Sequence, residues 1–389
     1  MGQLLTGHIP KRHIPTGHLP TGHIPTGKRT YSAKNLPLYA LLGFLMLSSV
    51  GLQARGPGAV ILQYHHVATG TPAATSIAPD QFARHLDYIA EQGYQVWPMS
   101  RLITALQQDQ TLPEDVVVIS FDDAYPGIYA NAWPLLKARG WPFTVFVATA
   151  YISETPGQYL SWSQLREMQL AGATIGNHTH DHSHLLRRLP NETTDAWQRR
   201  ARDQILQAQA LLTRHLGTAS RLFAYPYGEY DHHLEQLVAE LGFVAFGQQS
   251  GAVAPGSDLL ALPRFPLSGI YSDLDDLHTK LQTWPLPLAA VAARGADPLL
   301  EPQNTRPTLD LVFNNTDLAL DQLVCYGPDG PTSMTRISSS HYRAQTKTPL
   351  PVGRSRYNCT LPVHQSERYY WYSQLWVLRY PDGSWYAEP

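Results

Sequence analysis

The sequence predicts an α/β fold: a distorted (β/α) barrel of about seven to eight parallel strands, followed by a small all-β, sandwich-like domain. Two patterns carry this prediction. From Val60 to Leu267, short apolar runs alternate with segments of helical periodicity, and such dense alternation is typical of a parallel sheet covered by helices. After Trp284 the chain becomes rich in proline and alanine, and beyond Thr308 its segments are short and β-rich.

The barrel strands are expected where apolar runs are short and bounded by polar turns. The run at 116–124 is β-branched and apolar on both faces, as buried parallel strands are. The helices between the runs take their limits from local signals, such as the cap at Ser161 and the stops at Gly93, Gly140 and Gly172. Strands are expected at 60–67, 94–99, 116–124, 143–149, 174–180, 221–228, 243–249 and 262–267, and helices at 76–93, 126–140, 161–172, 193–215, 231–242 and 273–282.

Composition divides the chain into successive segments. Residues 1–54 are an N-terminal extension, in which TGHIP and TGHLP units repeat and a basic flank then precedes an apolar run at 36–52. This order predicts a secretion signal, and an uncleaved membrane anchor is the alternative. Residues 55–284 are expected to form the barrel domain, 285–307 a linker and 308–389 the β-rich domain.

Charge and cysteine content exclude some classes of function. The formal net charge is -2, and no basic block follows the N-terminal extension. Nucleic acid is therefore not an expected partner, because binding it requires a cationic face. Cys325 and Cys359 belong to no CxxC motif, so a thiolate metal site is not expected. In an oxidising compartment the two cysteines are expected to form a disulfide.

A pair of carboxylates marks the end of the predicted strand at 116–124. The carboxyl ends of the strands form the catalytic face of a β/α barrel. At the carboxyl end of a strand, Asp122 and Asp123 can take different roles in one site, because one carboxylate can bind a metal ion while the other accepts a proton. The alternative for this pair is a solvated turn.

Two further polar clusters follow later strands. After the strand at 174–180, histidines alternate at His178, His180, His182 and His184. Imidazole is a common ligand of zinc-like ions, although single histidines are usually structural. After the strand at 221–228 comes a Pro-Tyr-Gly turn around Tyr227. Such a turn can aim an amide N–H at a reacting carbonyl, or it can simply reverse the chain.

Taken in order, the segments SFDD, HTHDH and FAYPYG resemble a known family. They are similar to the polysaccharide deacetylases of carbohydrate esterase family 4, which share the NodB homology domain, and the resemblance covers about residues 59–284. It implies a divalent metal ion held by Asp123, His178 and His182, zinc being expected and nickel, cobalt or ferrous ion the alternatives. It also implies that Asp122 is the general base and that Tyr227 donates its backbone N–H to the oxyanion.

The sequence departs from the family pattern at two places. The arginine that often precedes the third motif, and that orients the catalytic aspartate, is replaced here by Ala224. We expect Arg264, at the end of the last predicted strand, to supply a guanidinium from another direction. The late leucine-histidine motif that provides the general acid matches Leu277-His278, although this pair falls in a predicted helix. His66 is the rival candidate for the acid.

The resemblance implies a hydrolase that removes N-acetyl groups from an amino-sugar polysaccharide. The opening YHHV and the FAYPYG turn are similar to the branch that acts on poly-β-1,6-N-acetylglucosamine, a biofilm exopolysaccharide. The alternatives are a peptidoglycan or chitooligosaccharide deacetylase, or an inactive glycan-binding protein. We expect a periplasmic or secreted protein, or one anchored in the inner membrane. The aromatic residues between Tyr369 and Tyr386 are expected either to stack on sugar rings or to form the C-terminal core.

Overall fold

The computed structural model describes residues 58–154, 157–218, 220–289, 295–314 and 317–388. All of these residues belong to one compact unit. The expected secretion signal and the TGHIP repeats therefore lie outside the described residues. In the part of the chain that is described, no helix is both long and apolar enough to cross a membrane.

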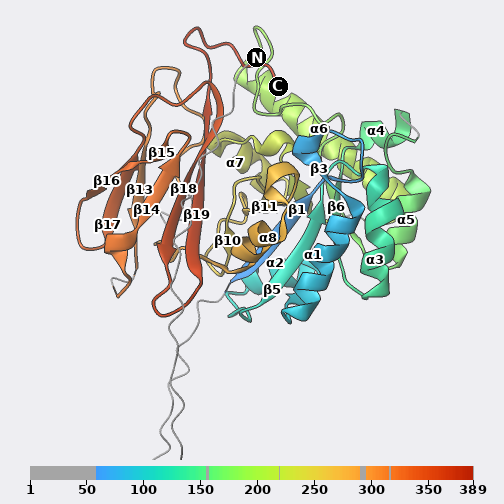
Figure 1. Cartoon of the computed structure of the whole chain (residues 1–389). Coiled ribbons are helices and arrows are strands. Elements are labelled where there is room, and N and C mark those ends of the chain that lie inside the picture. Colours follow the sequence, from blue (N-terminus) through green and yellow to red (C-terminus); the bar gives the residue numbers. More distant parts are fainter. Residues whose placement is uncertain (1–57, 155–156, 219, 290–294, 315–316, 389) are drawn as a thin grey trace, which may run out of the picture. The chain divides into compact units, whose positions relative to one another are not determined.

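A curved, mostly parallel sheet forms the centre of the first region (Figure 1). Its hydrogen-bonded order is β10-β1-β5-β6-β7-β8-β9, with β11 also paired to β1 and β4 to β5. Each pairing is parallel except that of β10 with β1. The strands are β1 (Ala59–Tyr64), β4 (Gln95–Val96), β5 (Val116–Phe121), β6 (Thr144–Val147), β7 (Thr174–Asn177), β8 (Leu222–Ala224), β9 (Val244–Phe246), β10 (Ala252–Val253) and β11 (Phe265–Pro266).

One short stretch of chain links the two edges of this sheet. Leu262 forms a parallel bridge with Phe246 of β9, and three residues later β11 begins its pairing with β1. The sheet thereby curls into a nearly closed barrel, which confirms the predicted fold class. The antiparallel β10 was not expected from the sequence; it pairs with the beginning of β1 at Ala59 and Val60.

Both faces of the barrel strands are buried. In β5, Val117, Ile119 and Phe121 belong to one apolar cluster, and Val116 and Val118 belong to another. This division follows from the two-residue period of a strand, which sends alternate side chains to opposite faces. The apolar pattern of 116–121 is therefore a signature of a strand covered on both sides.

Helices cover the outer face of the sheet (Figure 1). Four begin at side-chain caps: Ser161 forms a capping box with Gln164, and Thr193, Asp231 and Asp273 each accept a backbone N–H. The helices are α1 (Pro79–Glu91), α2 (Met99–Gln107), α3 (Trp133–Ala138), α4 (Thr149–Glu154), α5 (Trp162–Leu170), α6 (Thr194–Leu216), α7 (His232–Glu240) and α8 (Leu274–Leu281).

The helix expected at 126–140 is divided in two. A π-helical turn at Ile128–Ala132 precedes α3. Pro134, early in α3, lacks the N–H that an uninterrupted helix would use, which accounts for the change of hydrogen-bond pattern just before it. Helices α2 and α4 were not expected, because they are short and directly follow strands.

The C-terminal region consists of two antiparallel-rich sheets. One has the order β12-β19-β18-β14-β15, the other β13-β17-β16, and both contribute to one apolar core that contains Leu311, Tyr342 and Trp376. The strands are β12 (Thr283–Pro285), β13 (Thr308–Val312), β14 (Val324–Gly327), β15 (Gly330–Pro331), β16 (Ser333–Arg336), β17 (His341–Gln345), β18 (Gly353–Pro362) and β19 (Tyr369–Leu378).

The two cysteines are paired across this region. Cys325 of β14 lies opposite Cys359 of β18 in the sheet register, and the two form the expected disulfide. Because β12 pairs in parallel with β19, residues 283–285 belong to the C-terminal sheet. The domain limits proposed at 284 and 308 stay predictions.

Most of the C-terminal aromatic residues pack inward. Trp376 and Tyr386 are buried, and Trp371 makes an edge-to-face contact with Phe265 of the barrel. Tyr369, in contrast, is 45% exposed. The structure therefore favours a core role over sugar stacking for Trp376 and Tyr386.

Candidate active site

The three polar clusters meet at one edge of the barrel sheet. Asp122 and Asp123 follow β5, His178 follows β7, and the Tyr227 turn follows β8. The carboxyl ends of parallel strands share one edge, so residues far apart in the chain are brought together there. Four positions in these clusters have left-handed backbone conformations that are uncommon outside glycine: Asp123 at φ 68°, Thr179 at φ 69°, His182 at φ 56° and Tyr227 at φ 59°. Strain of this kind is often found at functional sites.

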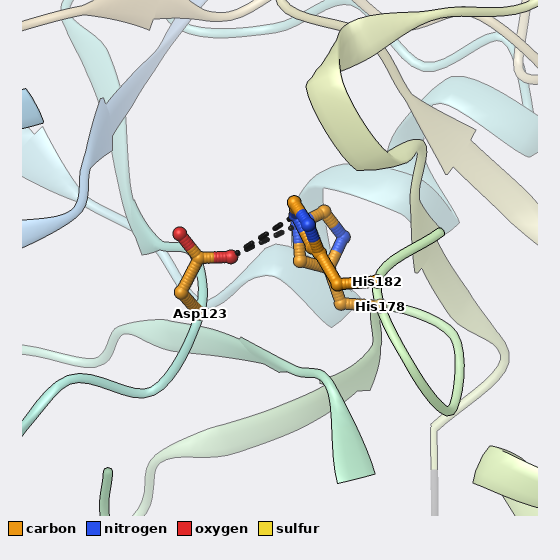
Figure 2. A group of neighbouring side chains, drawn as sticks. All are labelled: Asp123, His178 and His182. Carbon is orange, nitrogen blue, oxygen red and sulfur yellow. Dashed lines mark ion pairs between the residues drawn. The ribbon is translucent and has the colours of Figure 1, made fainter. Parts of the chain in front are cut away.

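Asp123, His178 and His182 form a compact ligand set (Figure 2). Asp123 Oδ1 lies 3.4 Å from His178 Nε2 and 3.3 Å from His182 Nε2. Among the described residues, Asp123 Oδ1 and His178 Nε2 have no hydrogen-bond partner although both atoms are buried. Unsatisfied buried polar atoms are costly, and a cation between them would remove that cost. The residues present therefore fit a divalent metal ion.

Neighbouring groups prepare these side chains to bind a cation. His178 Nδ1 lies 2.7 Å from the carbonyl oxygen of Ala224, which can only accept, so Nδ1 carries the proton and Nε2 is left as a free donor atom. Burial lowers the pKa of His182 to about 4, which keeps its ring neutral. Burial opposes ionisation of Asp123, but the adjacent histidines outweigh it and hold its pKa below the usual range.

Asp122 is fully buried and doubly hydrogen-bonded to Arg264. Arg264 Nη1 donates to Oδ1 at 2.7 Å and Nη2 to Oδ2 at 2.8 Å, and Gln63 Nε2 donates to Oδ2 at 2.6 Å. Burial alone would raise the pKa of Asp122, but the positive charge of Arg264 outweighs it, so the pKa lies below its usual value. Arg264 thus binds Asp122, the carboxylate to which the sequence analysis expected it to supply a guanidinium.

The Tyr227 turn lies beside this candidate ligand set. Tyr227 adopts φ 59° and ψ 4°, and its ring centroid is 4.6 Å from that of His182. Among the described residues, the backbone N–H of Tyr227 makes no hydrogen bond to the protein, whereas the next two N–H groups donate to Tyr225 and Pro226. A free amide at this position is suited to receive an oxyanion.

Two histidines that the sequence brought into consideration lie elsewhere: His278, the expected general acid, and His180, a member of the histidine cluster. His278 is exposed on α8, and its Nδ1 lies 2.5 Å from the hydroxyl of Tyr88 on α1. The structure does not bring it to the other site residues, because α8 packs against α1 rather than at the strand ends. His180 turns toward Thr149, with Nδ1 2.9 Å from Oγ1.

Of the two histidines in YHHV, His65 lies closer to Asp122 than His66, which the sequence had suggested as the general acid. His65 Nε2 lies 3.9 Å from Asp122 Oδ2, whereas His66 stacks on Tyr125 with ring centroids 3.5 Å apart. A signal was present in the sequence: Gln63 is a polar residue in an otherwise apolar run, and alternate residues of a strand share a face. Position 65 therefore shares the face of Gln63.

Comparisons with known proteins relate this chain to polysaccharide deacetylases. Residues 109–246 match the sequence model of the polysaccharide deacetylase family. The chain is 27% identical over 214 residues to a poly-β-1,6-N-acetyl-D-glucosamine N-deacetylase of Staphylococcus epidermidis, covering 54% of this chain and 72% of that one.

Solved structures share the overall fold of this region. IcaB from Ammonifex degensii is 28% identical, with a TM-score of 0.52 over 59% of this chain and 98% of that one. The Streptococcus pyogenes deacetylase PplD, solved with acetate, shares the fold at 22% identity and a TM-score of 0.52, over 58% of this chain and 99% of its own. Family match, related enzymes and fold point the same way: residues 109–246 match the polysaccharide deacetylase family, and the chain resembles the deacetylases of carbohydrate esterase family 4, which share the NodB homology domain.

Proposed function

We propose that the enzyme removes N-acetyl groups from an amino-sugar polymer with the help of a divalent ion held by Asp123, His178 and His182. The observation that carries this proposal is the convergence of a carboxylate oxygen and two imidazole nitrogens, all within 4.8 Å of one another, beside the buried Asp122. This donor set suits Zn²⁺, and nickel, cobalt and ferrous ions are the alternatives. The ion would supply Lewis acidity, which polarises a carbonyl group and makes water more acidic.

Asp122 acts in this proposal as the general base. Its lowered pKa keeps the carboxylate ionised, so it can accept a proton from the water that attacks the acetamide carbon. Arg264 and Gln63 hold both carboxylate oxygens in one orientation. Their role is to position the base, because a correctly oriented group contributes more to the rate than a freely rotating one.

Tyr227 and His65 complete the proposed set of catalytic groups. The free N–H of Tyr227 donates a hydrogen bond to the carbonyl oxygen as negative charge develops on it. His65, 3.9 Å from Asp122, donates a proton to the amine nitrogen as the C–N bond breaks. The products are acetate and a free amino sugar. His65 takes the acid role that the sequence had suggested for His278 or His66.

The proposed substrate is poly-β-1,6-N-acetylglucosamine or a similar exopolysaccharide. The Staphylococcus epidermidis relative is named for action on that polymer, which supports the proposal. Peptidoglycan and chitooligosaccharides are the competing substrates. We further propose a periplasmic or secreted enzyme, because the Cys325–Cys359 disulfide suits an oxidising compartment.

Acetate release tests the proposed function directly. The purified, zinc-loaded enzyme is incubated with β-1,6-linked and β-1,4-linked N-acetylglucosamine oligomers of equal length and with peptidoglycan. We expect the highest kcat/KM on the β-1,6 series. Equal or better turnover of the β-1,4 series would reject the substrate while leaving the chemistry in place. No acetate from any of them would reject the deacetylase itself and favour an inactive glycan-binding protein.

A further inference from the structure

A second charged cluster lies next to the Tyr227 turn. Glu229, two residues beyond Tyr227, has an exposed fraction of 1%. Its carboxylate accepts hydrogen bonds from Arg187 Nη2 at 3.1 Å and Arg354 Nη1 at 3.0 Å, and also from the hydroxyl of Tyr386. His184 Nδ1 lies 2.8 Å from its other oxygen. Four groups from different parts of the chain thus surround one buried carboxylate.

The end of the chain closes this cluster. Glu388 binds both arginines, with Oε1 2.7 Å from Arg187 Nη2 and Oε2 2.7 Å from Arg354 Nη2. Arg187 Nη1 also donates to the carbonyl oxygen of Tyr386 at 2.8 Å. We call this set of residues the C-terminal brace: His184, Arg187, Glu229, Arg354, Tyr386 and Glu388.

The brace is not a second metal site. His184, Glu229 and Glu388 have the spacing of a ligand set. Two guanidinium groups already bind both carboxylates, however, and they supply the positive charge that a cation would bring. Bidentate and bridging arginines of this kind fix geometry as well as charge.

The brace contacts Tyr227 directly. The ring of His184 stacks on the ring of Tyr227, with centroids 3.6 Å apart and an angle of 9° between the planes. The guanidinium carbon of Arg354 lies 5.6 Å from the centre of the same ring. The backbone of Tyr227 is in the left-handed region. This conformation is unfavourable for any residue that has a side chain, so it persists only if the surroundings of Tyr227 hold it.

We infer that the C-terminal brace is a positioning device for the oxyanion turn: Arg354 of β18, together with Tyr386 and Glu388, holds the Tyr227 N–H in place. The inference rests on the proposed function, in which that N–H receives the oxyanion. The C-terminal region then acts as part of the catalytic machinery, because the turn that follows β8 is supported by the last residues of the chain.

Conservative variants of the brace test this inference in the zinc-loaded, full-length enzyme. Tyr386→Phe removes only the hydroxyl, and Glu388→Gln removes a charge while keeping the shape. Loss of one oxyanion donor lowers kcat by about 100-fold to 1,000-fold. Partial displacement of the Tyr227 N–H in the double variant, which carries both Tyr386→Phe and Glu388→Gln, should therefore lower kcat about 10-fold. KM should stay within about two-fold, because a contact used in the transition state is affected. Glu388→Asp should restore part of the rate.

Hydrogen–deuterium exchange provides a readout that does not need activity. Peptides covering residues 226–230 should exchange faster in the double variant, and peptides of β5 should not change. The matched control is Asp310→Asn, which breaks an exposed ion pair with Arg343 in the same region; it should leave kcat and exchange at 226–230 unchanged.

Four results would overturn the inference about the C-terminal brace. These are unchanged kcat in the double variant, unchanged exchange of the turn, faster exchange throughout the barrel, and an equal loss of kcat in the control. Inactive wild-type enzyme rejects the proposed function instead, and exchange at 226–230 still tests whether the brace holds the turn.

Discussion

Replacing Arg264 by methionine is expected to impair both stability and catalysis. The change keeps much of the side-chain length but removes the guanidinium that binds both oxygens of Asp122. Arg264 and Asp122 are each fully buried. Breaking a buried ion pair by removing one partner costs about 3–5 kcal/mol, because the other charge is left uncompensated. We therefore expect the free energy of unfolding at pH 7 to fall by about that amount.

The same change should alter the pH dependence in a defined direction. In the wild type the pKa of Asp122 is lowered, so this group contributes stability above its unfolded pKa, and that stability is lost as the pH falls through the folded value. Without Arg264, burial becomes the main influence and raises the pKa. The carboxylate then destabilises the fold at neutral pH, and part of the loss is recovered as the pH falls and Asp122 takes up a proton.

Catalysis should follow the ionisation of the base. The acid limb of kcat/KM should move to higher pH in Arg264→Met, and kcat at pH 7 should fall more than KM rises. Urea unfolding at pH 5 and pH 7 and a pH–rate profile measure the two effects. The control is Arg343→Met, which removes an exposed pair with similar geometry and should cost less than about 1 kcal/mol. An Arg264→Met enzyme with the wild-type acid limb and wild-type stability would refute the reasoning.

Five further substitutions test other parts of the site and fold. Asp122→Asn should retain the metal ion but lose about 100-fold to 10,000-fold in kcat; near-normal acetate release would show that Asp122 is not the base. His178→Ala should lose the ion and the activity while its circular dichroism stays native, and full metal occupancy, measured by mass spectrometry, would contradict the ligand assignment. His65→Gln should lower kcat strongly, whereas His278→Gln should not, and the reverse order would restore the acid role to His278. Cys325→Ser opens a loop closed over a sequence separation of 34 and should cost about 3–4 kcal/mol in thermal or urea unfolding; an unchanged midpoint would mean that the bond does not stabilise the fold.

The sequence predicted those parts of the site that lie at the ends of barrel strands. Asp122, His178 and Tyr227 each follow an apolar run, and parallel strands bring their carboxyl ends to one edge. The convergence therefore follows from the fold class. The position of Arg264 depends in addition on barrel closure, because the stretch from Leu262 to β11 must lie between β9 and β1.

Other features could not be predicted, or were overlooked. Periodicity placed His278 on a helix but does not say which neighbour that helix packs against. The brace joins Glu229 to residues 125 and 157 positions away, and ion pairs at such separations leave no local pattern. Strand β18 did leave a pattern: its buried and partly buried residues alternate from Gly353 to Pro362, as the period of a half-covered strand requires.

Metal titration of the wild-type enzyme tests the central claim most directly. The protein is freed of metal with a chelator, Zn²⁺ is added in steps, and bound zinc and acetate release from β-1,6-linked N-acetylglucosamine oligomers are measured on the same samples. We predict that acetate release rises in proportion to occupancy and reaches its limit at about one ion per chain, as a single three-ligand site requires. Full acetate release by the metal-free protein, or none at full occupancy, would contradict the account.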